Sequence, residues 1–437
     1  MSNKLKKLNT DTKKKTLTRI KDYKGITEYK LKNGLTVLYM HMPQTGVITT
    51  NITYKVGSRD ERSGETGLAH MLEHMLFKPT TYDLKRKIDS SAMQFERETG
   101  CILNANTWKD RTTYFFSYPK EYFSRALQIE AERMHDVVLT DKEFLPEQGN
   151  VLSEFDMYFG DPYFALNFNM VPALFHSHTY GHETIGFRED IERFTCEKLR
   201  AFYERFYDPC NATLMVIGDI EEKTAITEVE KHFGSLRTNG TVDRNDTIIE
   251  PKQEGLRRVV VTRPSQSNIV AFGMLHEGFP EKGWFATSLL SAILTGGPDS
   301  ILYKKLVDTG LASKVEMSVE PTSEKNAAFL YVTLSKKSTH EGIEKKVFEI
   351  IRDLDPKEIA LQYKKTQAHI LTDEIVGRDT SLKVAMEITE YVSAGVWEKF
   401  FDTQEMLKTL TAKDIVAKAQ QLFIKDQMTI GHFIGKN

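Results

Sequence analysis

Apolar and polar residues alternate with two different periods, which divide the first half of the chain into extended and helical segments. Residues 27–40 alternate around Asn33-Gly34, a pair typical of a tight β-hairpin. Strand-like runs, rich in β-branched and aromatic residues, occupy 47–56, 103–118 and 214–218. Apolar residues at helical spacing mark 66–77, 122–138, 141–158 and 196–206. The first half therefore predicts strands interleaved with helices.

The second half repeats this order after a polar interruption. Residues 238–257 contain Asn239-Gly240 and several acids without an apolar period, so we expect a linker there. Strand-like and helical runs then resume at 258–262, 268–274, 284–294 and 329–334, followed by long amphipathic helices. We expect an α+β fold of two related halves, each an antiparallel sheet with helices packed on one face.

The same pattern sets the expected domain boundaries. Residues 1–22 are expected to be a disordered basic tail, because lysines crowd positions 4–15 and no apolar segment follows. A transit peptide is the alternative, but the first arginine is Arg19. Residues 23–237 are expected to form the first domain, 238–257 the linker, and 258–437 a second homologous domain.

Composition narrows the classes of protein to consider. The 437 residues are 40% hydrophobic and 27% charged, which is typical of soluble globular chains. The net charge of −2 gives no reason to expect nucleic acid as a partner. No apolar run reaches the roughly 20 residues of a membrane span. Three cysteines are too few for a disulfide framework, which favours a reducing compartment. With no signal peptide or membrane span evident, we expect a cytoplasmic location.

One short segment combines residues that can bind a metal ion. In His70-Met71-Leu72-Glu73-His74 the two histidines are four residues apart, so on a helix their imidazoles share a face. Glu73 lies about 60° around the helix from His70 and can reach a water on the same ion. This order is the inverted form of the zincin motif. The alternative is chance, since a pattern with three fixed positions recurs in unrelated proteins.

A catalytic zinc needs a third protein ligand and one open position. Glu147 and Glu154 are seven residues apart on a predicted helix and so share a face. One carboxylate can bind the metal, and the other can accept a hydrogen bond from a ligating histidine. Spacing alone leaves open which is which, and a solvated acidic helix face is the alternative.

These residues resemble those of the pitrilysin-like zinc metallopeptidases, or inverzincins. That family includes the beta-type subunit of mitochondrial processing peptidase and bacterial two-subunit relatives. The matching stretches are 31–35, 56–61, 64–78, 104–107, 147–154, 207–212 and 216–219. They cover most of the first half, whereas the second half matches more loosely.

The resemblance implies a role for each matching residue. His70, His74 and Glu154 would hold Zn²⁺, and Glu147 would support one of these ligands. Glu73 would be the general base that takes a proton from water and delivers it to the leaving amine. A further set, Asn104, Ala105 and Asn106, would lie on an edge strand that receives the substrate backbone. The implied function is that of a zinc-dependent endopeptidase.

The second half departs from the family pattern, in which an arginine and, seven residues later, a tyrosine approach the substrate. Here Ser313 stands at the tyrosine position, and Leu306 or Val307 at the arginine position. The second domain also lacks the metal motif. We therefore expect the metal-bearing subunit of a two-subunit enzyme, in which a same-family partner supplies the missing Arg and Tyr. A homodimer is the alternative assembly.

Other assignments remain as alternatives. The chain could be a non-catalytic structural or assembly subunit of the family, or a metal-binding protein without peptidase activity. The cluster His176, His178, His182 and Glu183 could suggest a second metal, although packing and polar contacts are the favoured interpretation. Cys101 lies near the expected substrate strand, but a zinc site already accounts for hydrolysis.

Overall fold

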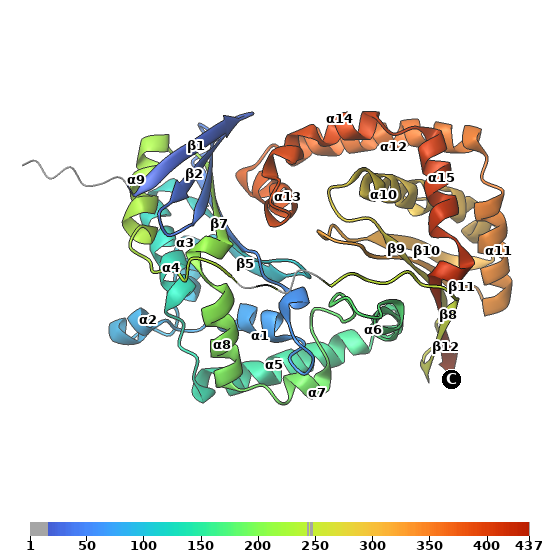
Figure 1. The fold of residues 1–437 in the computed structure, drawn as a ribbon, viewed down its shortest axis with the longest axis horizontal. Helices are drawn as coiled ribbons and strands as arrows, with labels where there is room; N and C mark the ends of the chain where they lie inside the picture. The colour runs from blue at the N-terminus through green and yellow to red at the C-terminus, as the bar shows by residue number, and fades with distance from the viewer. Residues whose placement is uncertain (1–15, 243, 245–247, 437) are drawn as a thin grey trace, which may run out of the picture.

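The computed structural model describes residues 16–242, 244 and 248–436, which fold into two halves side by side, each built around one sheet (Figure 1). The first sheet has seven strands in the order β1-β2-β3-β7-β4-β6-β5. Its strands are β1 Leu17–Tyr23, β2 Ile26–Leu31, β3 Thr36–His41, β4 Val47–Tyr54, β5 Ile102–Thr107, β6 Thr112–Pro119 and β7 Ala212–Gly218. The expected hairpin is β2–β3, and Gly34 in its turn has φ +91.

The second sheet has five strands in the order β10-β11-β9-β12-β8. Its strands are β8 Arg257–Pro264, β9 Asn268–His276, β10 Ala312–Val319, β11 Asn326–Leu334 and β12 Met428–Lys436. The two-half α+β class is confirmed, and each sheet is mixed because it contains one parallel pair, β3–β7 and β12–β8. Strands β7 and β12 return to their sheets after several helices, and such crossovers allow parallel pairing.

Helices surround both sheets. Those of the first half are α1 Leu68–Met75, α2 Thr81–Arg86, α3 Ser91–Thr99, α4 Phe123–His135, α5 Asp141–Phe159, α6 Pro162–Leu174, α7 Arg188–Ile191, α8 Cys196–Phe206 and α9 Glu222–Phe233. Those of the second are α10 Lys282–Thr295, α11 His340–Arg352, α12 Pro356–Gly377, α13 Ser381–Ser393, α14 Thr403–Lys408 and α15 Ala412–Leu422. Within the described residues, no helix combines the length and the hydropathy needed to cross a membrane.

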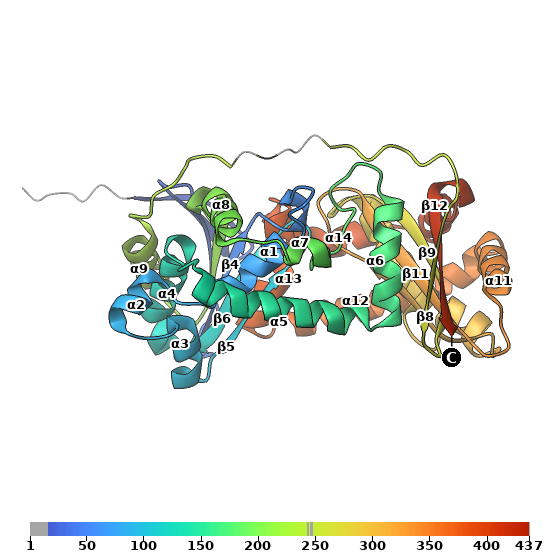
Figure 2. The ribbon, with the colours of Figure 1, turned by 90° about the horizontal axis from the view of Figure 1, so that it is seen from below.

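One helix of each half packs on the sheet of the other half. The helices of each half cover one face of its own sheet, and α6 and α13 cover the remaining faces of the opposite sheets (Figures 1 and 2). Helix α13 meets β4 through polar contacts: Asn51 Nδ2 donates to Thr389 Oγ1 at 3.1 Å, and Ser381 Oγ lies 2.8 Å from Thr49 Oγ1. The exchange ties the two halves together along their length.

The prediction of a disordered tail over residues 1–22 is wrong for its last part, because Leu17–Tyr23 form β1, paired with β2. Leu17 is buried, and both the backbone nitrogen and the hydroxyl of Thr16 donate to Glu230, at 3.0 and 2.9 Å. The buried Leu17 and the contact between Thr16 and Glu230 thus hold β1 in place, although the segment before it is rich in lysine. Residues 1–15 lie outside the described residues.

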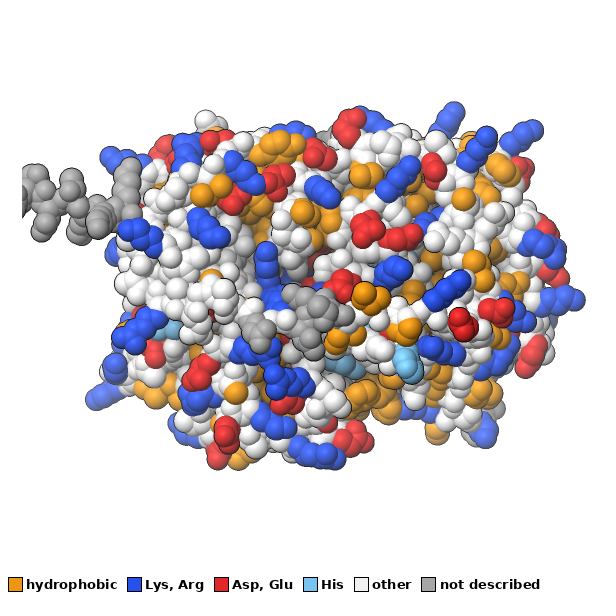
Figure 3. All heavy atoms as spheres, in the orientation of Figure 1, with side chains coloured by type: hydrophobic (Ala, Val, Ile, Leu, Met, Phe, Trp, Pro, Cys, Tyr) orange, Lys and Arg blue, Asp and Glu red, His pale blue; other side chains and the backbone are white. Residues whose placement is uncertain are grey.

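The cysteines and the surface charges agree with what the composition predicts. The three cysteines are free thiols. On the face in Figure 3, basic and acidic side chains are interspersed. The cytoplasmic location stays a prediction.

Candidate metal centre

Helix α1 is held in place at its first turn and along one stripe. Its N-cap, Gly67, has φ +96, and the Glu61 carboxylate accepts hydrogen bonds from the backbone nitrogens of Gly67 and Ala69, both at 2.8 Å. The predicted core stripe is buried, with each side chain at most 1% exposed: Leu68, Met71, Leu72, Met75 and Leu76. Because this stripe faces the core, the polar side chains of α1 project beside it, toward α5.

The polar residues of α1 meet Glu154 of α5. His70 Nε2 lies 3.7 Å from Glu154 Oε2, and His74 Nε2 lies 3.5 Å from the same oxygen. One ligand atom from each of the three residues lies within 4.8 Å of the other two. Among the described residues, these three form the one group of histidine, cysteine or acidic side chains that lie close enough together to share an ion.

The donor set suits zinc in spacing and in chemistry. Bonds of about 2.0–2.2 Å at a tetrahedral ion place neighbouring ligand atoms about 3.3 Å apart, close to the 3.5 and 3.7 Å observed. Burial, with the nearby His74, lowers the pKa of His70 to about 4, so its imidazole is neutral, as a ligand must be. The hydrogen bond to His74 lowers the pKa of Glu154, which keeps that carboxylate ionised.

Glu147 lies on the far side of His74. Its Oε2 is 3.4 Å from His74 Nδ1, while its Oε1 accepts from Lys78 Nζ at 2.5 Å and from Asn150 Nδ2 at 3.0 Å. Burial opposes ionisation of Glu147, but the Lys78 ammonium prevails and lowers its pKa. The structure therefore separates the two acids of α5: Glu154 faces both Nε2 atoms, and Glu147 faces the opposite ring nitrogen of His74.

Glu73 is held by a residue that received no separate role in the sequence analysis. The Thr107 hydroxyl at the end of β5 donates to Glu73 Oε2 at 2.6 Å. Burial raises the pKa of Glu73. Thr107 belongs to the matching stretch 104–107, but the two residues are 34 positions apart and only the folded chain brings them together.

The expected substrate strand is an edge strand, because among the described strands β5 pairs with β6 alone and ends the sheet order. Asn104 is exposed, and its side-chain oxygen accepts from the backbone nitrogen of Ala105 at 2.8 Å. Asn106 accepts from Arg111, whose Nε also lies 3.1 Å from both carboxylate oxygens of Glu390 in α13. The structure thus brings the edge strand close to α1, and Arg111 links Asn106 of that strand to Glu390 of α13.

The alternative candidates have other partners. His178 Nε2 lies 2.8 Å from Glu324 Oε2, and His182 Nδ1 lies 3.1 Å from the backbone oxygen of Glu183. These residues do not form a metal-binding group in the described part of the chain. Cys101 is buried, and burial raises the pKa of its thiol, which disfavours a nucleophilic thiolate.

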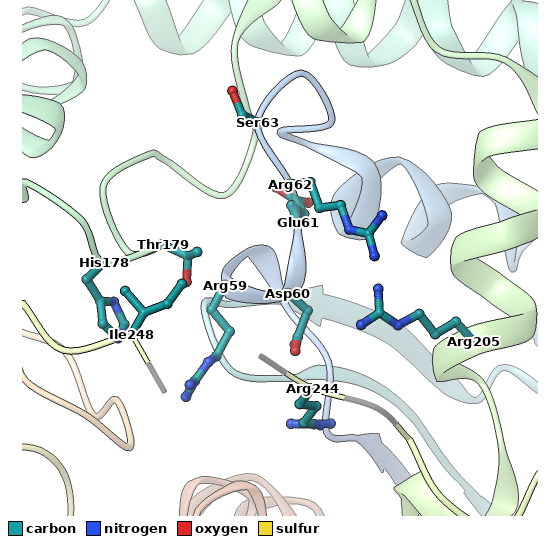
Figure 4. A pocket seen from close by; sticks show the side chains of 10 residues that line it. All are labelled: Arg59, Asp60, Glu61, Arg62, Ser63, His178, Thr179, Arg205, Arg244 and Ile248. Atoms are coloured by element: carbon teal, nitrogen blue, oxygen red, sulfur yellow. The ribbon is translucent and has the colours of Figure 1, made fainter. Parts of the chain in front are cut away.

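A separate cavity of about 450 Å³ is lined in part by residues 59–63, which precede α1 in the chain (Figure 4). Its lining residues are Arg59, Asp60, Glu61, Arg62, Ser63, His178, Thr179, Arg205, Arg244 and Ile248. It contains none of the predicted site residues. Its contribution to the metal centre is indirect, since Glu61 in its wall also binds the first turn of α1.

Comparison with known families supports the resemblance in both halves. Residues 36–186 match the family described as "Insulinase (Peptidase family M16)", and residues 193–359 match "Peptidase M16 inactive domain". The chain is 30% identical to "Zinc protease PqqE" of Helicobacter pylori over 406 residues, which cover 91% of this chain and 90% of that protein. It is 26% identical over 425 residues to an uncharacterized zinc protease of Rickettsia felis, covering 93% and 97% of the two chains.

Solved structures share the fold. A crystal structure of a protease from Helicobacter pylori superposes with a TM-score of 0.87 at 28% identity, covering 94% of this chain and 99% of that one. The first half of the periplasmic protease PqqL from Escherichia coli superposes with a TM-score of 0.74 at 17% identity, covering 96% and 94%. Against the whole of PqqL, the chain spans 48% of the length.

Proposed function

Since this chain belongs to peptidase family M16, we propose that it is the zinc-binding part of an endopeptidase that hydrolyses peptide bonds in peptides or unfolded segments. The observation that carries the proposal is the meeting of His70, His74 and Glu154 around one point, with Glu73 beside them. The relatives named zinc proteases support the same class of reaction.

Each polar residue of the site would have one task. His70, His74 and Glu154 would hold the ion, and Glu147 would orient the His74 ring through its Nδ1. A bound zinc ion supplies Lewis acidity, which makes water a nucleophile near neutral pH. The Glu73 carboxylate would take a proton from the attacking water and deliver it to the leaving amine. Its buried surroundings suit this exchange, because burial raises the pKa and favours the protonated form.

The substrate would bind along β5. An extended peptide can pair with the free edge of this strand through backbone hydrogen bonds, next to Asn104, Ala105 and Asn106. Such pairing reads the backbone more than the side chains. We therefore propose broad sequence tolerance.

We further propose that a second subunit completes the site. Ser313 stands at the start of β10, and Leu306 or Val307 stands at the arginine position. None of these side chains carries the guanidinium or phenol that the family pattern places there. Two longer proteases contain this fold within one chain: this chain spans 48% of PqqL and 47% of the ferredoxin protease FusC. A same-family partner that carries the Arg and Tyr would take the place of the other half.

Glu73→Gln tests the catalytic assignment. We expect the variant to keep its zinc, measured by elemental analysis, and to lose about 10²–10⁴-fold in peptide cleavage, because the amide cannot accept the proton. Glu197→Gln, an exposed change on α8, serves as the control and should behave as wild type. Unchanged turnover of Glu73→Gln would remove that residue from its role.

The two-subunit proposal has its own test, which is a pull-down of the native protein with metal analysis of the complex. The isolated chain should cleave peptides poorly, and a co-purified relative should restore cleavage. Full activity of the isolated monomer would contradict the need for a partner. Zinc and an intact motif without any cleavage in the complex would favour a structural or assembly subunit.

A further inference from the structure

The hydrogen bond between Thr107 and Glu73 has the length of a charge-assisted contact. Thr107 Oγ1 lies 2.6 Å from Glu73 Oε2, within the range of about 2.5–2.7 Å for a hydroxyl donating to a carboxylate. The Thr107 hydroxyl is the donor, and the Glu73 carboxylate oxygen accepts. This contact holds one oxygen of the proposed general base.

The surroundings direct the Thr107 proton toward Glu73. Thr112, which faces Thr107 across β5 and β6, lies 3.4 Å away between hydroxyl oxygens, and its own hydroxyl donates to the Val56 backbone oxygen at 2.9 Å. The Thr107 hydroxyl has a single proton, and the contact to Glu73 is shorter than the one to Thr112 by 0.8 Å (3.4 − 2.6). The branched Thr107 side chain also has few rotamers to sample.

The place of Thr107 on β5 gives the contact a further consequence. Side chains two positions apart on a strand share a face, so Thr107 points to the same side as the buried Ala105. Asn104 and Asn106 lie on the opposite face. One strand therefore supplies both the free edge for a peptide and the donor that holds Glu73.

We propose that Thr107 is a positioning residue that fixes the Glu73 carboxylate relative to a peptide bound on β5. The proposal rests on the function proposed above, because it assumes that Glu73 acts on water beside the ion. Without the hydroxyl, the buried carboxylate keeps the Thr107 backbone contact but loses the side-chain donor, so it turns from its working orientation. The peptide and the ligands are unaffected, so binding persists while turnover falls.

The test compares variants of the full chain together with any co-purified partner. Thr107→Val keeps the shape and removes the donor, and partners of this kind typically contribute about 10–100-fold to activity. We expect kcat on an internally quenched peptide mixture to fall by about that factor, with KM and zinc content unchanged. Thr107→Ser returns the hydroxyl and should restore most of kcat.

Thr53→Val is the matched control. Its buried hydroxyl contacts Asn51 Oδ1 at 3.0 Å and Thr113 Oγ1 at 3.2 Å, and is not bonded to Glu73. It should leave kcat at the wild-type value. A crystal structure of Thr107→Val provides a readout apart from activity, and we expect the Glu73 carboxylate to have rotated.

The outcomes separate the two proposals when Glu73→Gln is measured alongside. Loss of turnover in Glu73→Gln with wild-type kcat in Thr107→Val would overturn the positioning role alone. Retained turnover in Glu73→Gln would overturn the proposed function and the positioning role with it. An unmoved Glu73 in the Thr107→Val structure, or equal losses in Thr107→Val and Thr53→Val, would also overturn the positioning role.

Discussion

Two histidines one turn apart on α1 experience opposite electrostatic effects. Burial and the neighbouring His74 lower the pKa of His70 to about 4. Burial also acts on His74, but hydrogen bonds to Glu154 and Glu147, with the nearby Glu73, raise its pKa overall. The pKa of His74 thus depends strongly on the neighbouring carboxylates. Glu147 is the one of these that contacts Nδ1, the ring nitrogen that faces away from Glu154.

This dependence predicts the effect of Glu147→Gln. The amide loses the ion pair with Lys78 and the charged contact to His74 Nδ1, so the ring is less firmly oriented. We expect the affinity for zinc to fall by about 10–100-fold without loss of the fold, measured by competition with a chelator. Glu143→Gln, on the same helix and paired at the surface with Lys142, is the control. Equal affinities in the two variants would contradict the prediction.

Apart from the family resemblance, the residue pattern relates residues of the site only where helix geometry connects them. Spacings of four and seven place His70 with His74, and Glu147 with Glu154, on common faces. Which of the two acids faces the ligands depends on how α1 lies across α5, which no local pattern records. The role of Thr107 was missed for a similar reason, because its contact with Glu73 depends on the packing of β5 against α1.

Among the elements, those with a clear period were predictable and those formed by long-range pairing were not. The β2–β3 hairpin, α5 and α8 follow their periods closely. Strand β1 directly follows a lysine-rich segment, and β12 contains two glycines, so neither has a strong local signal. Parallel pairing joins strands far apart in sequence, and for this reason the mixed character of both sheets was not foreseen.

The start of α1 provides a prediction at the scale of one element. Gly67 and Gly64 both have positive φ, +96 and +85, but a Cβ at Gly67 would lie 2.5 Å from the Ile185 backbone oxygen, whereas Gly64 has nothing within 4 Å. Alanine at Gly64 should cost only backbone strain, about 1–2 kcal/mol of unfolding free energy. Gly67→Ala should cost clearly more and also weaken zinc binding, because the clash shifts α1. Denaturant unfolding checks this, and equal losses in both variants would contradict it.

For the whole molecule, the exchanged helices imply that the two halves fold together. Met170 of α6 lies against the second sheet at Gly431, where a Cβ would be 2.2 Å from its sulfur. Helix α13 correspondingly covers β4 in the first sheet. Each sheet therefore needs a helix from the other half to complete its core. The sequence pattern predicted two similar halves but not this exchange, which depends on tertiary contacts between distant segments.

Calorimetry tests this dependence. We expect the full chain to unfold in one transition, with calorimetric and van't Hoff enthalpies equal. Met170→Ala should shift that single transition to lower temperature, by a loss of about 2–5 kcal/mol. Two separate transitions, with only one of them moved by Met170→Ala, would show that the halves are independent.

The central claim is that His70, His74 and Glu154 share one zinc ion. Its most direct test is anomalous diffraction at the zinc edge on crystals of the full chain. The account predicts a single strong peak at bonding distance, about 2.0–2.2 Å, from the Nε2 atoms of His70 and His74 and a carboxylate oxygen of Glu154. A zinc-loaded crystal with no peak there, or with its peak beside His178 and His182 instead, would contradict it.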